Sequence, residues 1–304
     1  MRALLWIASV VLAAAVAFAA DKEPATNIRE ATLVGSPGGN TEKLMSLDRG
    51  SSLAILEQRT TDGQPWMKVA VRIAGESSSA PARESQGWVP AKVIVPATTA
   101  NGDEIIYGEA ADSEQQAERR GGRRSAAEDA MRLYYRVAEM FPNSSLAAEA
   151  MWRSADIRWQ LDRSRGAKTG DDHYLQEVIS KFPRTKWADL AAYDLLDSQL
   201  CGGWNGEADC PGKEAALYES YARQHPQSPK FGEALYNAAY RLGGIADLYR
   251  ASANKEQSDA AHGKALALAR ELAGNRTLGE WSYRGEDLMY KLQQNITLYG
   301  VAQQ

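Results

Sequence analysis

The two cysteines are the residues whose type and spacing most directly suggest chemistry. Cys201 and Cys210 are the only cysteines among the 304 residues, and they enclose the glycine-rich loop 202–209. In an oxidising compartment, two such thiols would close this loop as a disulfide. A zinc site would need further ligands, and a redox-active pair usually follows the shorter Cys-X-X-Cys spacing. We therefore predict a structural disulfide and no metal site, with zinc as the alternative.

Acid–base chemistry has few candidates. The histidines are His173, His225 and His262. His225 stands where two other copies of the same pattern have phenylalanine, so a packing role explains it better than a catalytic one. Asp171 and Asp172 precede His173 and could hold a cation, but the positive end of a helix also attracts acidic residues. No nucleophile elbow, phosphate-binding glycine loop or His-Glu-x-x-His signature occurs. We predict no catalytic residues and no cofactor. The alternative is an enzyme in which acids or histidines converge in a pocket.

Composition and charge argue against a nucleic-acid partner. The chain is 44% hydrophobic and 24% charged, which is ordinary for a globular protein of two domains, and its net charge is −4. A global basic field that would recruit nucleic acid is therefore lacking. The run 118–124 carries arginines around two glycines and could grip phosphates. Because no aromatic residue interleaves with them, we expect a solvated linker there instead.

The first twenty residues have the pattern of a secretory signal peptide. Met1-Arg2 precedes the apolar run 3–20, and Ala17-Phe18-Ala19 provides a small-x-small cleavage site. We expect cleavage near Ala19 or Ala20 and a periplasmic or secreted mature protein. The alternative is that the run stays as a membrane anchor. No cysteine follows the run, so membrane association through a lipid anchor is not expected.

The elements that must position any site follow from an apolar pattern that occurs three times between residues 125 and 240. Each copy has apolar residues at i, i+3, i+4 and i+7, which is one face of a helix, and each ends in a proline that stops the helix. The copies end at Phe141-Pro142, Phe182-Pro183 and His225-Pro226, with spacings of 41 and 43 residues. An alanine-rich helix follows each stop. The pattern predicts repeated helical hairpins.

Local signals place the ends of this helical region. Ser125 and Glu128 predict a capping box on the first helix, and Thr185 predicts a cap on another. After residue 244 the regularity fades into a degenerate fourth repeat. A final helix is expected to close the apolar end of the array. Its predicted apolar face consists of Leu288, Leu292, Ile296 and Tyr299.

These features resemble tetratricopeptide-like repeats, and in particular periplasmic and outer-membrane assembly proteins of that family. The shared features are the aromatic-Pro step, the Ser/Thr-rich turn and the alanine-rich second helix. A period near forty residues exceeds the usual thirty-four of this family. The resemblance implies an all-α solenoid over residues 125–304.

Residues 26–96 have a different character, with short runs of β-forming residues between turns. The expected strands cover 31–34, 53–56, 66–73 and 88–95. Three segments, 47–53, 62–69 and 87–90, resemble the bacterial SH3 family. The resemblance implies a small all-β barrel in which Gly50 permits a turn and Trp66 and Trp88 fill the core. It also implies a binding module of envelope or cell-wall proteins, although residues 76–86 form an enlarged Ser/Ala/Pro insertion.

Together these observations predict an exported multidomain protein. Residues 1–20 are the signal peptide, 26–96 an SH3-like barrel, 97–124 a polar linker and 125–304 a solenoid. Among the aromatic residues of the repeats, Trp159 and Trp204 are the first candidates for exposed partner-binding residues because both lie near loops.

We expect a non-enzymatic adaptor or scaffold. Its helices would bind an envelope protein or peptide, and its SH3-like domain would bind an envelope ligand such as peptidoglycan. One alternative is a peptidoglycan-recognition subunit that regulates a cell-wall hydrolase. The other is an enzyme with an unrecognised site.

Overall fold

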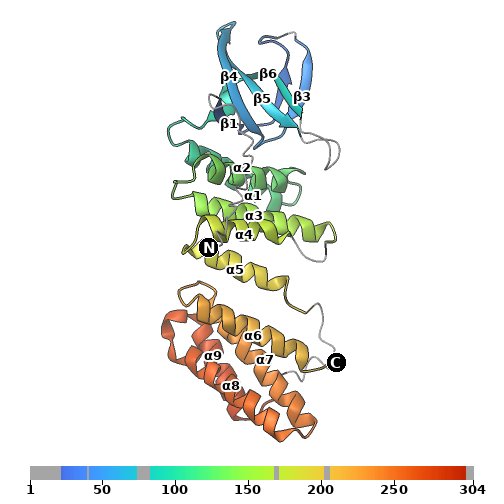
Figure 1. Cartoon of the computed structure of the whole chain (residues 1–304), viewed down its shortest axis with the longest axis vertical. Coiled ribbons are helices and arrows are strands. Elements are labelled where there is room, and N and C mark those ends of the chain that lie inside the picture. The colour runs from blue at the N-terminus through green and yellow to red at the C-terminus, as the bar shows by residue number, and fades with distance from the viewer. Residues whose placement is uncertain (1–21, 40, 74–82, 168–170, 202–205, 299–304) are drawn as a thin grey trace, which may run out of the picture. The chain divides into compact units, whose positions relative to one another are not determined.

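The computed structural model describes residues 22–39, 41–73, 83–167, 171–201 and 206–298. The chain divides into two compact units, Met1–Gly102 and Asp103–Gln304. The predicted order of a strand domain followed by a helical domain is confirmed (Figure 1). The predicted signal segment 1–20 lies outside the described residues.

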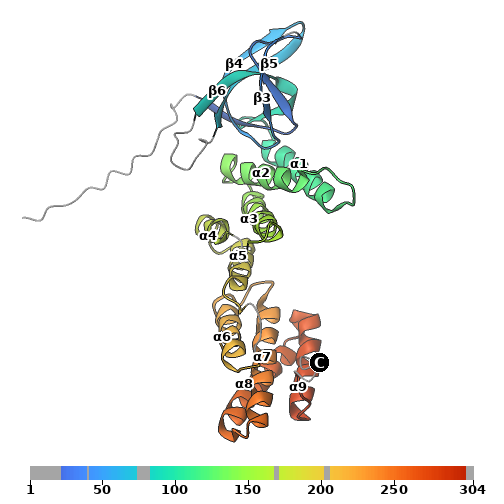
Figure 2. The same ribbon diagram turned by 90° about the vertical axis from the view of Figure 1, so that its right-hand side faces the viewer.

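The first unit is an antiparallel sheet with strand order β3-β2-β6-β5-β4-β1-β7. Its strands are β1 (Glu23–Asn27), β2 (Ala31–Val34), β3 (Lys43–Leu47), β4 (Ser52–Thr61), β5 (Gln64–Ile73), β6 (Arg83–Pro90) and β7 (Ile94–Pro96). A short 3-10 turn, Ala91–Val93, separates β6 from β7. The long β4–β5 hairpin is visible at the top of Figure 2. The core of this unit is built from side chains such as Leu33, Leu47, Val69 and Val89.

Turn residues explain where the chain of this unit reverses. Asp62 and Gly63 both have positive φ, 52° and 72°, which suits the two-residue turn between β4 and β5. Gly50 has φ 75°, as its predicted turn role requires, and its N–H donates to the carbonyl of Asn27 at 2.8 Å. Trp88 is buried, as predicted, whereas Trp66 is only partly buried.

The sheet is larger than the sequence suggested. Strands β1 and β3 were not predicted, and β4 continues to Thr61, well beyond the expected 53–56. The buried residues of β1 include Thr26 and Asn27, and β3 is mostly exposed, so neither strand carries a clean apolar alternation. Pairing with neighbouring strands, rather than the β-propensity of their own residues, determines strands β1 and β3.

The second unit consists of helices. They are α1 (Gly102–Glu118), α2 (Ala126–Met140), α3 (Ala147–Ser164), α4 (Asp172–Lys181), α5 (Lys186–Asp197), α6 (Asp209–Gln224), α7 (Phe231–Ala251), α8 (Lys255–Gly274) and α9 (Glu280–Gln293). From α2 onward, helices that are neighbours in sequence pack against each other, and α9 lies beside both α7 and α8 (Figure 2). None of the described helices combines the length and the apolar character needed to cross a membrane.

The three aromatic-Pro steps end their helices in the same way. Phe141, Phe182 and His225 follow the last residues of α2, α4 and α6, with φ/ψ of −128/59°, −124/51° and −124/59°. Proline at the next position disfavours the helical region for each of them, so the helix stops there. In each case the C-cap N–H donates to a carbonyl four residues earlier. The predicted helix stops are confirmed.

Residues 97–124, expected to be a polar linker, include helix α1. Its Ile106 and Ala110 are fully buried, and its Tyr107 hydroxyl donates to Glu149 at 2.8 Å. The apolar positions of α1 are few and its polar residues many, so composition concealed the helix. In the basic run, Arg123 is paired with the buried Asp129 at 2.8 Å. The helical unit therefore begins about twenty residues before the predicted boundary.

At two helix ends the structure differs from the sequence prediction. Ser125 makes no capping hydrogen bond and instead donates to the carboxylate of Asp129 at 3.1 Å, because that buried carboxylate attracts every nearby donor. Thr185 does cap α5, accepting from Ala188 N at 3.2 Å. Helix α9 ends at Gln293, so Ile296 is exposed and does not extend its apolar face. Tyr299 lies outside the described residues.

Two apolar clusters hold the helical unit together. One joins α2 to α5, and the other joins α5 to α9. Gly285 lets α9 approach α8 closely, since a Cβ at this position would lie 2.5 Å from Cβ of Leu272. Four apolar residues of α8, Ala265, Leu268, Ala269 and Leu272, are all buried.

Candidate functional site

The predicted disulfide is present. The sulfurs of Cys201 and Cys210 are 2.13 Å apart, and the N–H of Cys201 donates to Glu214 at 3.1 Å. The cysteines and Glu214 also form a group of metal-ligand type, but sulfurs joined in a disulfide are not thiolates and do not bind zinc. The bridge anchors the segment that leads into α6. Trp204, the candidate within the loop, lies outside the described residues.

The three histidines do not come together. His173 is in α4 and His262 in α8, while His225 follows the last residue of α6. The imidazole of His225 stacks on Tyr221, with centroids 4.7 Å apart, and its Nδ1 is 2.8 Å from Asp189 Oδ1. His225 thus packs between helices as the aromatic-Pro pattern implies. Asp171 caps α4 by accepting from His173 N at 3.0 Å.

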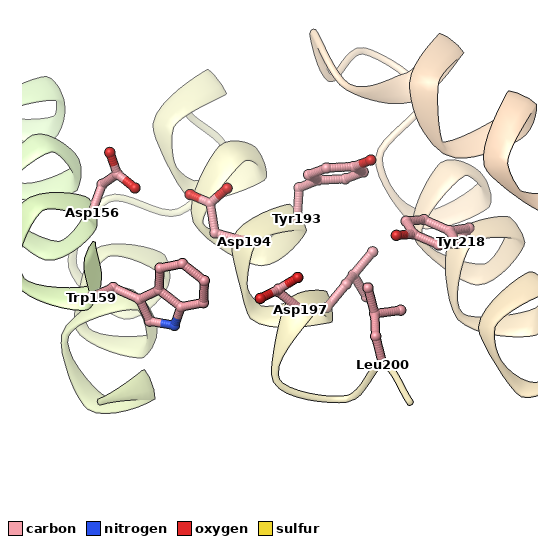
Figure 3. A pocket seen from close by; sticks show the side chains of 8 residues that line it. Asp156, Trp159, Tyr193, Asp194, Asp197, Leu200 and Tyr218 are labelled. Carbon is pink, nitrogen blue, oxygen red and sulfur yellow. The ribbon is translucent and has the colours of Figure 1, made fainter. Parts of the chain in front are cut away.

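The other candidate, Trp159, lines an open pocket of about 200 Å³. Trp159 is partly buried rather than exposed, and its Nε1 is buried without a hydrogen-bond partner among the described residues. Asp156 and Trp159 come from α3, three positions apart and hence on one helix face. Figure 3 shows them at one side, with side chains of α5 in the middle and Tyr218 of α6 at the other side.

Carboxylates and aromatic rings share this pocket. Helix α5 contributes Tyr193, Asp194, Leu196 and Asp197, and the chain after it contributes Leu200. Asp197 is paired with Arg163 at 2.7 Å, and that guanidinium also lies 4.8 Å from the ring centroid of Trp159.

Asp156 and Asp194 lack such a partner: among the described residues, no Lys, Arg or His lies within ion-pair distance of either carboxylate.

Burial perturbs both unpaired carboxyl groups. Desolvation, reinforced by the negative charge of Asp194, raises the pKa of Asp156 to about 6. Burial also raises the pKa of Asp194, against the hydrogen bond that it accepts from Trp152 Nε1 at 2.9 Å. Asp156 itself accepts only from Gln160, at 2.8 Å. Two carboxylates held away from water with no ion-pair partner among the described residues form an unfavourable arrangement, which a bound cation would relieve.

The acidic residues of the pocket were not singled out from the sequence, although one signal was available. Asp156 and Asp197 are 41 residues apart, the same spacing as Phe141 and Phe182. They therefore occupy equivalent positions on successive second helices. Neither Asp194 nor Tyr218 follows this spacing, so only packing brings them to the pocket.

No protein-family model matches the chain, and no curated protein matches it at a significant level.

Proposed function

We propose that this protein is a non-enzymatic exported adaptor with two binding modules. Its helices, as tetratricopeptide-like repeats, bind an envelope protein or peptide. Its strand domain, as an SH3-like module, binds an envelope ligand such as peptidoglycan. The observation that carries the proposal is the open pocket around Trp159, in which Asp156 and Asp194 have no ion-pair partner among the residues that the structure describes.

The chemistry of this pocket favours a partner with a lysine or arginine side chain. The aliphatic stem of such a side chain suits the apolar surface of Trp159, Leu196 and Leu200, and its charged head suits the carboxylates. Binding would give a counter-charge to carboxylates that folding has desolvated. The interaction therefore contributes more to the binding free energy than an exposed ion pair would. Retaining desolvated acids at a cost in stability is typical of functional sites.

Support for the repeat assignment comes from the three equivalent helix ends and their spacing of about forty residues. Support for the SH3-like assignment is weaker and consists of the three sequence motifs, the positive φ of Gly50 and the buried Trp88 in an antiparallel sheet. The cleaved signal peptide and the periplasmic or secreted location are inferred from residues 1–20 alone.

The proposed role of the pocket is tested by binding of the full mature chain, with its disulfide formed, to a peptide array. The array compares peptides that differ only in lysine, arginine, norleucine or glutamate at one position. We expect retention of basic peptides, and loss of this preference in Asp194→Asn and Trp159→Ala. Asp259→Asn, which removes an exposed acid from α8, is the matched control. Equal binding of norleucine and lysine peptides would rule out the proposed recognition.

The role of the strand domain is tested by sedimentation with purified peptidoglycan sacculi. We compare the full mature chain with a chain that begins at Asp103, where the helical unit starts. If only the full chain sediments, the strand domain is the wall-binding module. If neither sediments, peptidoglycan is not its ligand, and the alternative of a recognition subunit for a wall hydrolase is lost as well.

One observation favours an enzyme as the second candidate. Asp156 and Asp194 converge in one pocket with raised pKa values, and paired acids of this kind can serve as general acid and base. Release of soluble fragments from sacculi by the full chain, abolished in Asp156→Asn, would establish this candidate over the adaptor.

A further inference from the structure

A second open pocket, of about 230 Å³, lies among α2, α3 and α4 and has the opposite chemistry. Its lining includes three arginines, two tyrosines and a serine: Arg132, Tyr135, Arg136, Ser154, Arg158 and Tyr174. No carboxylate is among the described residues that line it. The positive charge that remains in this pocket depends on the acids nearby.

Two of these arginines already have carboxylate partners. Asp129, a buried carboxylate, contacts Arg132 at 2.5 Å and Arg123 at 2.8 Å. Arg136 pairs with Glu139, a half-exposed side chain on the same helix. An exposed carboxylate of that kind screens a neighbouring charge only weakly.

Arg158 is the least satisfied of the three arginines. Its nearest carboxylate oxygen, on Asp162, is 3.8 Å away, which is beyond hydrogen-bond distance. Its guanidinium donates no hydrogen bond to any described residue and lies 4.8 Å from the ring centroid of Tyr174. The Nε of Arg136 is likewise buried without a partner among the described residues. Donors that remain unsatisfied in a partly buried pocket cost free energy until an acceptor reaches them.

We propose that this pocket binds an oxyanion, namely the phosphate or carboxylate group of a small ligand. The guanidinium group of Arg158 and the Nε of Arg136 are the donors without an acceptor among the described residues, and a planar guanidinium fork matches these anions. The pocket volume exceeds what a bare anion needs, so the ligand has a body that contacts the tyrosine rings.

The site is separate from the acidic pocket around Trp159. Ser154 and Arg158 lie four residues apart on one face of α3, whereas Asp156 and Trp159 project more than 90° away around the helix. Changes in one pocket can therefore be made without altering the lining of the other, and the two proposals can fail independently.

The test is isothermal titration of the full oxidised chain with inorganic phosphate and, in a second arm, with malonate, against sodium chloride of equal ionic strength. We expect saturable binding of at least one of these anions. Arg158→Gln should weaken it about tenfold or more, because charge-assisted hydrogen bonds are lost. Arg158→Lys keeps the charge but not the fork and should lose less. Preference for phosphate or malonate identifies the anion class.

The matched control is Arg165→Gln, which removes the same charge just beyond the end of α3, where Arg165 pairs with Glu128 outside the pocket. Its affinity should stay within about twofold of the unchanged chain, as expected for an exposed ion pair. Circular dichroism confirms that each variant is folded, and Arg158→Lys replaces Arg158→Gln if the latter is not. The proposal is overturned if neither anion binds saturably, or if Arg165→Gln weakens binding as much as the Arg158 variants do.

Discussion

At the scale of single residues, the acidic pocket around Trp159 lowers the stability of the unbound protein through the same buried carboxylates that would bind a cationic side chain. Burial raises the pKa of the Asp156 carboxyl group to about 6 in the folded protein, from its ordinary value of 3.8. Between these values the folded state binds more protons than the unfolded state, so stability falls as the pH rises through that window. Above pH 6 the folded protein carries the full loss of stability that comes from burying the ionised carboxylate. The charged groups that act on Asp156 come from α1, α3 and α5: Glu114, Arg153 and Asp194.

Asp156→Asn should therefore stabilise the protein at neutral pH. We expect the free energy of unfolding to rise by roughly 2 kcal/mol at most at pH 7.5, with the gain disappearing below about pH 3, where the carboxyl group is protonated in both states. Urea unfolding at the two pH values measures the effect. A gain that is equal at both pH values would show that charge burial is not its cause.

Tyr221 makes the strongest single polar link between α5 and the end of α6. Its hydroxyl donates to the carbonyl of Asp189 at 2.8 Å and lies 2.6 Å from Ser228 Oγ, and its side chain is almost fully buried. Tyr221→Phe should lower the free energy of unfolding by about 1–2 kcal/mol, because buried partners lose a hydrogen bond.

Tyr218→Phe provides the control for this change. Tyr218 is buried in the same helix, and its hydroxyl makes no hydrogen bond to a described residue. Its replacement should change stability by less than about 0.5 kcal/mol. Denaturant unfolding measures both variants. Similar losses of unfolding free energy in the two would contradict the role given to the Tyr221 hydroxyl.

At the scale of elements, α1 is integral to the helical unit although its sequence reads as a connector. Glu114 accepts from Tyr134 at 2.7 Å and from Arg153 at 3.0 Å, which ties α1 to both α2 and α3. The ring of Tyr107 contacts that of Tyr134 edge to face, with centroids 5.2 Å apart. These polar and aromatic links replace the broad apolar stripe that usually identifies a packed helix.

The neighbouring isoleucines of α1 test this conclusion directly. Ile106 is fully buried, whereas Ile105 is 40% exposed. Ile106→Ala should cost about 2–4 kcal/mol of unfolding free energy through lost burial and a cavity, and Ile105→Ala less than about 1 kcal/mol. Equal and small losses in denaturant unfolding would mean that α1 does not pack on the helical unit in solution.

At the scale of the whole molecule, the strand unit and the helical unit each contain an apolar core. The core around Val69 and Val89 is built from residues of the strand unit, and the clusters that join α2 to α5 and α5 to α9 are built from residues of the helical unit. Each unit therefore has its own source of cooperativity.

Calorimetry of the full mature chain should accordingly show two unfolding transitions. Reduction of the Cys201–Cys210 bridge should lower only the helical one, by roughly 5–10 °C, because the disulfide restricts the unfolded chain across a short loop. A single transition, or an equal shift of both after reduction, would contradict the independence of the two cores.

The sequence by itself determined the features that depend on neighbouring residues. Proline forces its predecessor out of the helical region wherever it occurs, so the ends of α2, α4 and α6 at Phe141, Phe182 and His225 were readable from the chain. The strand-then-helix order was readable from the local patterns, the turn at Gly50 from the resemblance to the bacterial SH3 family, and the disulfide from there being only two cysteines.

Tertiary packing decided the features that depend on residues far apart in the chain. Helix α1 and strands β1 and β3 lack a clear apolar period, and only their partners make them regular. Asp156 and Asp194 are 38 residues apart in sequence and reach one pocket only because α3 and α5 pack together. Their raised pKa values arise from desolvation, which exists only in the folded chain.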